Sequence, residues 1–525
     1  MLRRAASIAL FAAAVASCQA TEPVEYDIRI SGGLVYDGTS EQGVETDVYI
    51  DDDKIVFIGD GDTENVSARS TIDASGLVVA PGFIDPHTHT LSDVMFSDEG
   101  KRLAGYLTQG VTTVVSGNDG GGPVDLAGAL RAAEERGTGT NFALFTGHGS
   151  IRSDVMGREN RVPTDAEIDE MQGLLRQALS DGALGLSTGL YYAPASYAGL
   201  NEIVALAKVA AEFDALYESH IRDESSYSVG LLGGIEEALE IGRQSGADVH
   251  IAHIKALGVD VWGQSIDVIA LIEAAQRDGI TVTADQYPWS ASGTRISNAL
   301  IPNWAKADSD EAMFARLRAP ENQNRLIAEV SENLRKRGGA DAILLVARTD
   351  GLPSRTLTDE AAAMQLDPVQ AAIEIVLRGD ARIASFNMQD DDIENYMRQP
   401  WVMTGSDGTN GHPRKYASFP RKYRTYVVDK STLSLADFIH RSTSLAAETL
   451  GLCERGQIRV GYHADILVFD PATFAPVADF SNPAELSVGV EHLLVNGQSA
   501  IADGVLADTL HGQPLRRGLC VGDEE

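Results

Sequence analysis

Two histidines separated by a single residue are the first side chains in this chain that could do chemistry together. They follow a hydrophobic run, residues 77–79, in the stretch APGFIDPHTHT at residues 80–90. In an extended strand, side chains two residues apart project to the same face, so Asp85, His87 and His89 point the same way. Two imidazoles at one strand end suit a divalent cation. A His-x-His pair also arises by chance on polar strand ends, so the interpretation needs further ligands.

Other strand-like segments also end in residues that can bind a metal ion or move a proton. These residues are Asp119, His148, His220, His253, Asp285 and Asp407. Basic, hydroxyl or aromatic residues follow several of them, namely Arg222, Lys255, Tyr287, Ser292, Arg295 and Arg414. A solvated loop face carries mixed polar residues rather than this concentration of histidine and aspartate. The pattern therefore favours one metal site assembled from several strand ends.

One strand offers two histidines, and the alternation of side chains separates them. His253 shares a face with Lys255, whereas His250 lies on the opposite face of an extended strand. His253 is also nearer the strand end. We therefore predict that His253 is the ligand and that His250 packs between its strand and the helices that cover the strands. For Arg222, the alternative to a substrate contact is a salt bridge to Asp223 or Glu224.

The elements that must position these residues alternate between strand and helix patterns. The strand-like segments span residues 77–85, 111–117, 140–148, 183–189, 215–221, 248–255, 280–288 and 401–408. Eight strands alternating with amphipathic helices predict an α/β fold, a (β/α)8 TIM barrel. Chemistry in such barrels sits at the carboxyl ends of the strands. Residues 290–398 exceed one crossover and show helical patterns at 309–337 and 358–378. They predict a helical insertion between strands seven and eight.

Short alternating strands with Gly/Asp turns occupy both ends of the chain. They occur at residues 26–60 and again at 456–470 and 490–504. We predict a small β-sandwich built from residues 24–80 together with 455–525, and a barrel domain at 81–454. Two cysteines, Cys453 and Cys520, lie near the C-terminus, where they either pair or remain separate buried thiols.

The first 23 residues read as a targeting segment. Arg3 and Arg4 precede an apolar run, residues 5–16, which is too short to span a bilayer. The run ends at Cys18 in a pattern that resembles a bacterial lipobox. This predicts a lipoprotein-type signal peptide and an exported protein that is lipid-anchored in the cell envelope, at the periplasm or outer membrane. The alternative is a secreted protein in which Cys18 is not lipidated.

The charge of the chain limits its partners. The formal net charge of −34 argues against nucleic acid and against adsorption to anionic lipid. The expected partner is a small molecule, and the only expected membrane contact is an N-terminal lipid at Cys18. If the substrate is an anion, basic residues in the site must overcome this acidic background.

The motifs together carry a resemblance that covers nearly the whole mature chain. In order, they are APGFIDPHTHT, GVTTVVSGNDG, TGHGSIR, GLSTGLYYAPASYA, SHIRDE, AHIKALGVDVWGQS, DQYPWSASGT, GSDGTNGHPRKYASFPR and GYHADILVFDP. This set resembles the amidohydrolase superfamily and, within it, the N-acyl-D-amino-acid deacylase (D-aminoacylase) group. One such motif would be weak, but nine in order at the predicted strand ends form a specific signal.

The resemblance implies a metal site and a catalytic carboxylate. His220 and His253 would bind the tightly held ion, and His87 and His89 a second, weaker one. Asp407 would be the catalytic residue. The deacylases carry a metal-binding cysteine where this chain has Asp119. We expect Zn²⁺, as one or two ions, while a carboxylate in place of a thiolate also admits Mn²⁺ or Co²⁺ because it is a harder ligand. The alternative for Asp119 is a turn-capping role in its Gly-rich loop.

The resemblance also implies a substrate and a reaction. Lys255, Tyr287 and Arg414 would hold the α-carboxylate of the substrate. The deacylases carry a hydroxyl residue at the position of Gly293, and Ser292 is adjacent. Arg295 is a candidate contact for an acidic substrate side chain, with a plain surface position as the alternative.

The implied reaction is hydrolysis of the linear amide bond in N-acyl-D-amino acids, or in dipeptides with a C-terminal D-residue. Metal-activated water would attack, and Asp407 would act first as general base and then as general acid. One alternative is a cyclic-amide hydrolase of the dihydroorotase or hydantoinase type. The strand at 183–189 has no lysine to be carboxylated, which disfavours it. The other alternative is a non-catalytic lipoprotein that binds a metal or ligand.

Overall fold

The computed structural model describes residues 24–346 and 354–518 of the 525-residue chain. The predicted signal peptide and Cys18 lie outside the described residues, and export stays a prediction. Cys453 is disulfide-bonded, and the other two cysteines of the chain both lie outside these ranges. Within the two ranges, no helix combines the length and the apolar character that a bilayer crossing requires.

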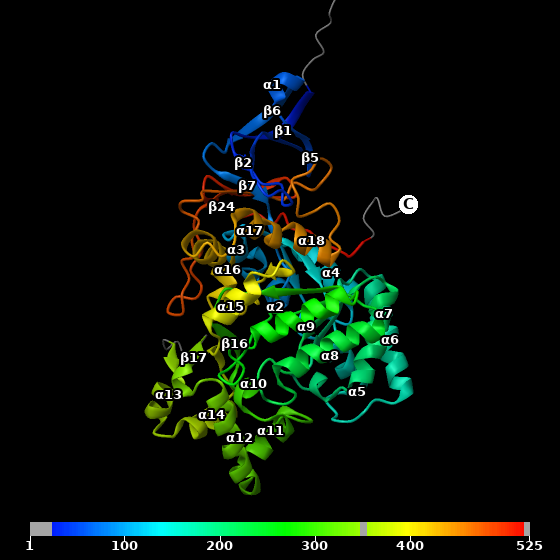
Figure 1. Ribbon diagram of the computed structural model, residues 1–525, viewed down its shortest axis with the longest axis vertical. Coiled ribbons are helices and arrows are strands. Elements are labelled where there is room, and N and C mark those ends of the chain that lie inside the picture. Colours follow the sequence, from blue (N-terminus) through cyan, green and yellow to red (C-terminus); the bar gives the residue numbers. More distant parts are fainter. Residues whose placement is uncertain (1–23, 347–353, 519–525) are drawn as a thin grey trace, which may run out of the picture.

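Eight parallel strands form the central barrel, between a β-rich end and a helical end of the molecule (Figure 1). In order they are β8 (Phe83–Asp85), β9 (Val111–Ser116), β10 with β11 (Asn141–Leu144 and Thr146–Gly147), β12 (Gly185–Gly189), β13 (Leu216–His220), β14 (Val249–Ile251), β15 (Val282–Gln286) and β20 (Val402–Thr404). The first strand meets the last where the Asp407 N–H donates to the His87 carbonyl over 2.9 Å and Thr88 bridges Gly408. The predicted (β/α)8 barrel is confirmed.

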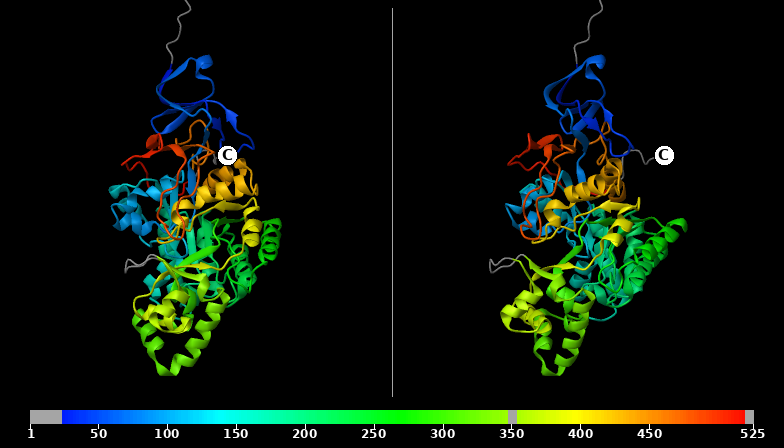
Figure 2. Two further views of the ribbon diagram at one scale, coloured as in Figure 1. Left: turned by 90° about the vertical axis from the view of Figure 1, so that its left-hand side faces the viewer. Right: turned by 60° about the vertical axis from the view of Figure 1, so that its left-hand side comes forward.

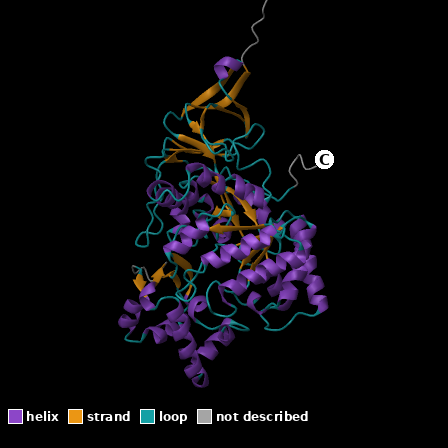
Figure 3. Ribbon diagram, in the orientation of Figure 1, coloured by secondary structure: helices purple, strands orange, loops and turns teal. Residues whose placement is uncertain are grey.

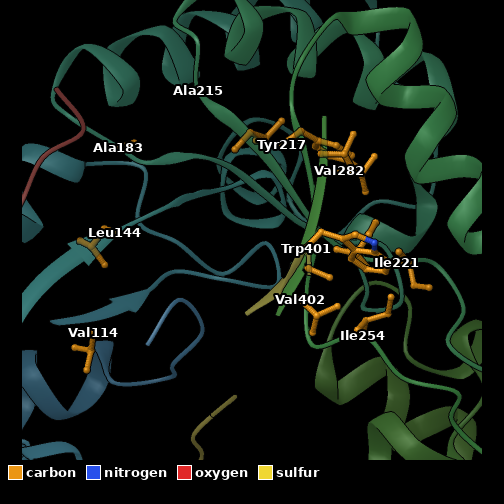
Figure 4. Close-up of a cluster of buried hydrophobic side chains, with 14 of the residues drawn as sticks. Val114, Leu144, Ala183, Ala215, Tyr217, Ile221, Ile254, Val282, Trp401 and Val402 are labelled. Atoms are coloured by element: carbon orange, nitrogen blue, oxygen red, sulfur yellow. The ribbon is translucent and has the colours of Figure 1, made fainter. Parts of the chain in front are cut away.

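Helices cover the outside of the barrel, as the secondary-structure colouring of Figure 3 shows. The longest are α4 (Leu126–Arg136), α6 (Asp165–Ser180), α7 (Leu200–Glu212), α8 (Gly230–Ser245) and α9 (Ser265–Arg277). Each buries an apolar stripe against the strands. Figure 4 shows part of the resulting core, with Val114, Leu144, Tyr217, Val282 and Val402 coming from five different strands. This packed wall fixes the strand ends on which the site is built.

Both ends of the chain contribute to a pair of sheets at one end of the barrel, the upper end in Figures 1 and 2. One sheet has the order β5-β4-β1-β6, with bounds Lys54–Ile58, Val48–Asp51, Val24–Ser31 and Val66–Asp73. The other has the order β24-β23-β22-β21-β7-β2-β3, with bounds Val505–Leu506, Gln498–Ala502, Val490–Val495, Ile466–Phe469, Val78–Pro81, Leu34–Val35 and Val44–Glu45. Ile30, Ile50, Val79 and Ile466 meet in one core between the sheets. The domain boundaries at residues 80 and 454 stay predictions.

The segment between β15 and β20 forms its own layer at the opposite end of the barrel (Figure 2). Its helices are α10 (Ile296–Leu300), α11 (Asp310–Arg318), α12 (Gln323–Lys336), α13 (Leu357–Met364) and α14 (Pro368–Leu377), whereas α15 (Asp390–Met397), the last helix before β20, packs against α9 of the barrel. They share the segment with a four-stranded sheet of order β16-β19-β17-β18, with bounds Ala291–Arg295, Arg382–Phe386, Ile343–Val346 and Arg355–Thr356. The predicted helical insertion is confirmed, and the structure adds this sheet, whose strands are too short to show a clear alternation in the sequence.

Candidate active site

Four candidate histidine ligands from three strand ends converge on one side chain, Asp119. Its Oδ1 lies 3.6 Å from His87 Nε2, 3.4 Å from His220 Nδ1 and 3.3 Å from His253 Nε2. Its Oδ2 lies 3.5 Å from His89 Nε2. One carboxylate therefore faces all four histidines, with one oxygen toward three of them and the other toward the fourth. The structure brings together all five predicted metal ligands.

Three residues of the candidate site adopt a left-handed backbone conformation, which is uncommon for residues other than glycine. Asp119 has φ +57°, His253 has φ +34° and Asp407 has φ +47°. Such backbones cost free energy and persist where the surroundings determine them, often at functional sites. Next to Asp119, Gly120 also has a positive φ, and a Cβ there would lie 2.8 Å from the Gly189 amide nitrogen. This close backbone contact fixes the loop that presents Asp119.

The donor atoms fit a divalent cation. His220 Nδ1 lies only 2.9 Å from His253 Nε2. His87 Nε2 and Asp119 Oδ1 are buried, and neither atom has a hydrogen-bond partner among the described residues. Burial alone would raise the pKa of Asp119, but His253, His87 and His220 hold it well below its usual range. The site thus stabilises an anion that needs positive charge beside it. Imidazole nitrogens with a carboxylate form a donor set suited to Zn²⁺.

A second buried carboxylate, Asp285, contacts two of these histidines, His87 and His253, and also contacts His250. Its Oδ2 lies 3.3 Å from His87 Nδ1 and 3.1 Å from His250 Nε2, and it accepts from the His253 backbone N–H over 3.1 Å. Burial would raise the pKa of Asp285, but His87 and His250 hold it well below its usual range. A carboxylate on the far nitrogen of a metal-binding histidine fixes its tautomer and orientation.

The contact with Asp285 corrects the prediction for His250. This side chain hydrogen-bonds inside the barrel and does not pack between the barrel and its helices. The two histidines do not occupy one regular strand, because β14 ends at Ile251 and the backbone turns at His253, so strict alternation does not relate their side chains. His253 nevertheless occupies the ligand cluster.

Glu224 is a site residue that the sequence argument did not nominate. It forms an ion pair with Lys255, and its Oε1 lies 3.1 Å from His253 Nδ1. Its Oε2 lies 3.8 Å from His220 Nε2. Arg222, predicted to pair with Asp223 or Glu224 if it bound no substrate, instead pairs with Glu237 over 2.7 Å. The SHIRDE motif carried the signal for Glu224, four residues after His220.

The predicted catalytic carboxylate lies at the edge of the cluster. Asp407 Oδ1 is 3.0 Å from His89 Nε2, and Arg414 Nη1 is 2.8 Å from Asp407 Oδ2. Burial would raise the pKa of Asp407, but Arg414 and His89 hold it well below its usual range. Asp407 is therefore ionised and can accept a proton.

A cavity of about 490 Å³ opens over the cluster, between the strand ends and the insertion. Predicted substrate residues that line it are Lys255, Tyr287, Ser292 and Arg295. Arg414 lies 4.8 Å from the centre of the Tyr287 ring and its guanidinium approaches Gly293. Ser292 Oγ accepts from the Asn387 amide over 3.1 Å.

Two other buried histidines have structural partners: His148 lies 2.9 Å from Glu202, and His412 Nε2 contacts the Ala291 carbonyl over 3.1 Å.

Comparison with known proteins identifies the family. The family model described as "Amidohydrolase family" matches residues 70–501, which include the barrel, the insertion and most of the C-terminal strands. The chain belongs to the amidohydrolase family. As in other folds of this type, its histidines and carboxylates meet at the carboxyl ends of the barrel strands.

Within the amidohydrolases, the chain is similar to several deacylases over most of its length. It is 32% identical to a D-aminoacylase of Alcaligenes xylosoxydans xylosoxydans, covering 94% of this chain and 98% of the relative. It is 33% identical to an N-acyl-D-aspartate deacylase of the same organism, covering 91% and 92%. A solved structure of an N-acyl-D-glutamate deacylase from Bordetella bronchiseptica, complexed with zinc and a phosphonate that mimics the tetrahedral intermediate, matches with a TM-score of 0.79 at 32% identity, covering 94% and 100%.

Proposed function

We propose that this protein is a metal-dependent hydrolase that cleaves the amide bond of N-acyl-D-amino acids or of dipeptides ending in a D-residue. The observation that carries the proposal is the Asp119 carboxylate facing four histidine nitrogens within 3.6 Å, beneath a cavity that Lys255 and Tyr287 line. The similarity to deacylases over more than nine-tenths of the chain supports the substrate class.

His220 and His253 would hold one ion, His87 and His89 would hold a second, and Asp119 would contact both. Zn²⁺ is the expected metal, with Mn²⁺ and Co²⁺ as alternatives because a carboxylate replaces the cysteine of the deacylases. When bound, such an ion lowers the pKa of water and polarises a carbonyl group. Asp285 and Glu224 would orient the imidazole rings through their outer nitrogens.

The remaining residues would bind the substrate and move protons. Lys255, Tyr287 and Arg414 would hold the α-carboxylate, since Lys255 and Tyr287 line the cavity, Arg414 lies against the Tyr287 ring, and cations with a phenol suit a carboxylate. Asp407 would accept a proton from the attacking water and return it to the amide nitrogen as the C–N bond breaks. The carboxylate product would leave with the water oxygen, and the D-amino acid would leave as the free amine.

Hydrolysis of a matched panel tests the proposal. The full chain would be freed of metal, reconstituted separately with Zn²⁺, Mn²⁺ or Co²⁺, and assayed with N-acetyl-D- and N-acetyl-L-amino acids of several side chains. Dihydroorotate and a hydantoin would report cyclic-amide hydrolysis. Release of D-amino acid that depends on added metal is the expected result. Turnover of only the cyclic amides, or metal binding without turnover of any compound, would contradict the proposal.

We further propose that the protein is exported and anchored by lipid at Cys18. Support comes from the sequence alone, in which Arg3 and Arg4 precede a short apolar run that ends at this cysteine. Mass spectrometry of the N-terminal peptide from the native host tests it. The expected peptide begins at Cys18 and carries a diacylglyceryl group, whereas a peptide that still begins at Met1 would contradict export.

A further inference from the structure

The loop that carries Asp119 is made almost entirely of glycine. It spans residues 117–122, with the sequence GNDGGG, between β9 and α4. Glycine leaves a backbone free to adopt many conformations. A metal-binding group, in contrast, must be held within about 0.5 Å of its working position by the residues around it. Contacts from outside the loop must therefore fix the Asp119 carboxylate among the four histidines.

One hydroxyl group binds this loop on both sides of Asp119. Ser187 lies on β12, and its Oγ donates to the Gly117 carbonyl over 2.6 Å and accepts from the Gly120 N–H over 3.1 Å. A hydroxyl has one proton to donate and lone pairs with which to accept, so it can make both bonds at once. Within the described part of the chain, no other side chain hydrogen-bonds to the backbone of residues 117–122.

The hydroxyl is presented from a rigid part of the barrel. Ser187 is fully buried, and it pairs in register with Gly147 on one side and Glu218 on the other. The loop packs directly against this wall, since a Cβ at Gly147 would lie 2.3 Å from the Gly120 carbonyl oxygen. Ser187 therefore connects a flexible sequence to a strand whose position is fixed by its neighbours.

The stretch between the two hydrogen bonds has an unusual backbone. Gly117 has φ +85°, Asp119 has φ +57° and Gly120 has φ +74°. A left-handed conformation costs free energy in a residue other than glycine and persists only where the surroundings impose it. The bonds from Ser187 lie at the two ends of this stretch. Their loss would let the backbone relax and would move the carboxylate that it presents.

We propose that Ser187 is a positioning residue of the metal site and that it acts through Asp119. The inference rests on the proposed function, in which Asp119 contacts both ions. The sequence of β12, GLSTG, offers no imidazole or carboxylate as a ligand, and Ser187 is not among the described residues that line the cavity. Its contribution is to keep Asp119 Oδ1 facing His87, His220 and His253.

A double-mutant cycle on metal affinity tests the proposal. Dissociation constants for Zn²⁺ would be measured by chelator competition for the wild type, Ser187→Ala, Asp119→Ala and the double variant. We expect Ser187→Ala to weaken Zn²⁺ binding by about 10–100-fold, the usual effect of removing a group that orients a metal ligand. In the Asp119→Ala background, the same change should cost at most about twofold, because the carboxylate that Ser187 positions is already absent. Unchanged affinity in Ser187→Ala, or equal losses in both backgrounds, would overturn the proposal.

Hydrogen exchange of the metal-free protein shows whether the loop itself loosens. The Gly120 N–H loses its acceptor in Ser187→Ala, so peptides that cover residues 117–122 should exchange faster than in the wild type. Peptides from α9 should exchange at the wild-type rate, because this helix has no contact with the hydroxyl. Exchange in residues 117–122 that stays at the wild-type rate would contradict a role of Ser187 in holding the loop.

Ser442→Ala is the matched control. Ser442 ends α17 (Leu435–Ser442), is fully buried like Ser187, and has its Oγ 2.8 Å from Thr404 Oγ1. Neither Ser442 nor Thr404 is among the described residues of the cavity wall. The control removes the same group at the same degree of burial, so it should leave Zn²⁺ affinity and exchange in residues 117–122 unchanged. A loss of affinity equal to that of Ser187→Ala would contradict the proposal.

Two further features keep the result decisive. If Ser187→Ala does not fold, Ser187→Cys replaces it in the cycle, because a thiol has a similar size and forms weaker hydrogen bonds. Zn²⁺ is the only ligand in the measurement, so the outcome does not depend on turnover. Failure to hydrolyse N-acyl-D-amino acids would reject the proposed function, whereas an additive cycle would reject the role of Ser187 alone.

Discussion

Arg414 and Asp407 form a buried ion pair, with 2.8 Å between Arg414 Nη1 and Asp407 Oδ2. The two residues lie seven positions apart in the motif GSDGTNGHPR. Arg414 contacts residues of both parts of the proposed chemistry, which are proton transfer by Asp407 and binding of the substrate carboxylate. It holds the Asp407 carboxylate in its ionised form, and it lies over the Tyr287 ring where the substrate carboxylate would bind. Binding of the substrate would divide the guanidinium between two carboxylates.

Replacing Asp407 by Asn should remove the proton acceptor without emptying the site. We expect kcat to fall by about 10²–10⁴-fold, the usual contribution of general acid–base catalysis. Metal content should stay near the wild-type value, because His87, His89, His220, His253 and Asp119 remain. Steady-state kinetics and elemental analysis of the same preparation measure both quantities. Asp429→Asn, an exposed change outside the cavity, is the control. An Asp407→Asn enzyme with nearly full kcat would exclude the proposed role.

Replacing Asp119 should change how much metal binds and which metal binds best. Asp119→Ala should lower the stoichiometry, because it removes the one carboxylate that contacts all four histidines. Asp119→Cys should shift relative affinity from Mn²⁺ toward Zn²⁺, since a thiolate is a softer ligand. Competition dialysis followed by elemental analysis measures both. Unchanged stoichiometry in Asp119→Ala would show that this residue only caps its loop.

The two pairs of histidines should differ in what their loss does to metal binding. His220→Ala should lose the tightly held ion and activity together, whereas His89→Ala should retain one ion per chain. The geometry agrees with a tighter site at His220, because His220 Nδ1 lies 2.9 Å from His253 Nε2, whereas His89 is the most exposed of the four histidines. Elemental analysis after gel filtration in a weak chelator gives the stoichiometries. Equal losses in the two variants would contradict separate positions.

Glu224 should affect metal affinity and substrate binding at once. Glu224→Gln removes the charge that faces His253 Nδ1 and pairs with Lys255. Changes around metal ligands of this kind typically cost about 10–100-fold in metal affinity or activity. Glu240→Gln, on α8 away from the cavity, is the matched control. Chelator titration reports metal affinity, and KM reports the freed lysine. A variant with wild-type values of both would show that Glu224 only fills space.

Phe83 should contribute strongly to the stability of the barrel. Its ring is fully buried and stacks on Phe419 with 5.3 Å between ring centres, with Phe438 against its edge. Truncation of a buried Phe to Ala costs about 3–5 kcal/mol of unfolding free energy. Phe96→Ala is the control, because Phe96 is 86% exposed and its loss should cost less than about 0.5 kcal/mol. Urea denaturation of both variants measures the difference.

The sequence predicted the structure correctly where a regular alternation of apolar and polar residues marks a strand. The eight barrel strands and the positions of the candidate ligands at their ends followed from runs of apolar residues and from what comes after them. The prediction was wrong or incomplete where a strand ends early or is too short to show a pattern. His250 was assigned to the wrong side because β14 stops at Ile251, and the sheet of the insertion escaped notice because its strands are short. Glu224 lies in the SHIRDE motif, but its contacts with His253 and Lys255 become visible only in the structure.

Local sequence patterns are sufficient to predict the barrel, the strand ends and the residue types that gather there. These follow from local chain geometry, in which side chains alternate along a strand and strands are connected in order. The three-dimensional fold is needed to see that one carboxylate, Asp119, faces all four histidines. The same is true of the ion pair between Arg414 and Asp407 and of the position of Arg295 opposite Arg382. His89 and Asp407 are 318 positions apart and yet lie 3.0 Å from each other. Distances of that kind depend on how the whole barrel closes, which local sequence patterns do not encode.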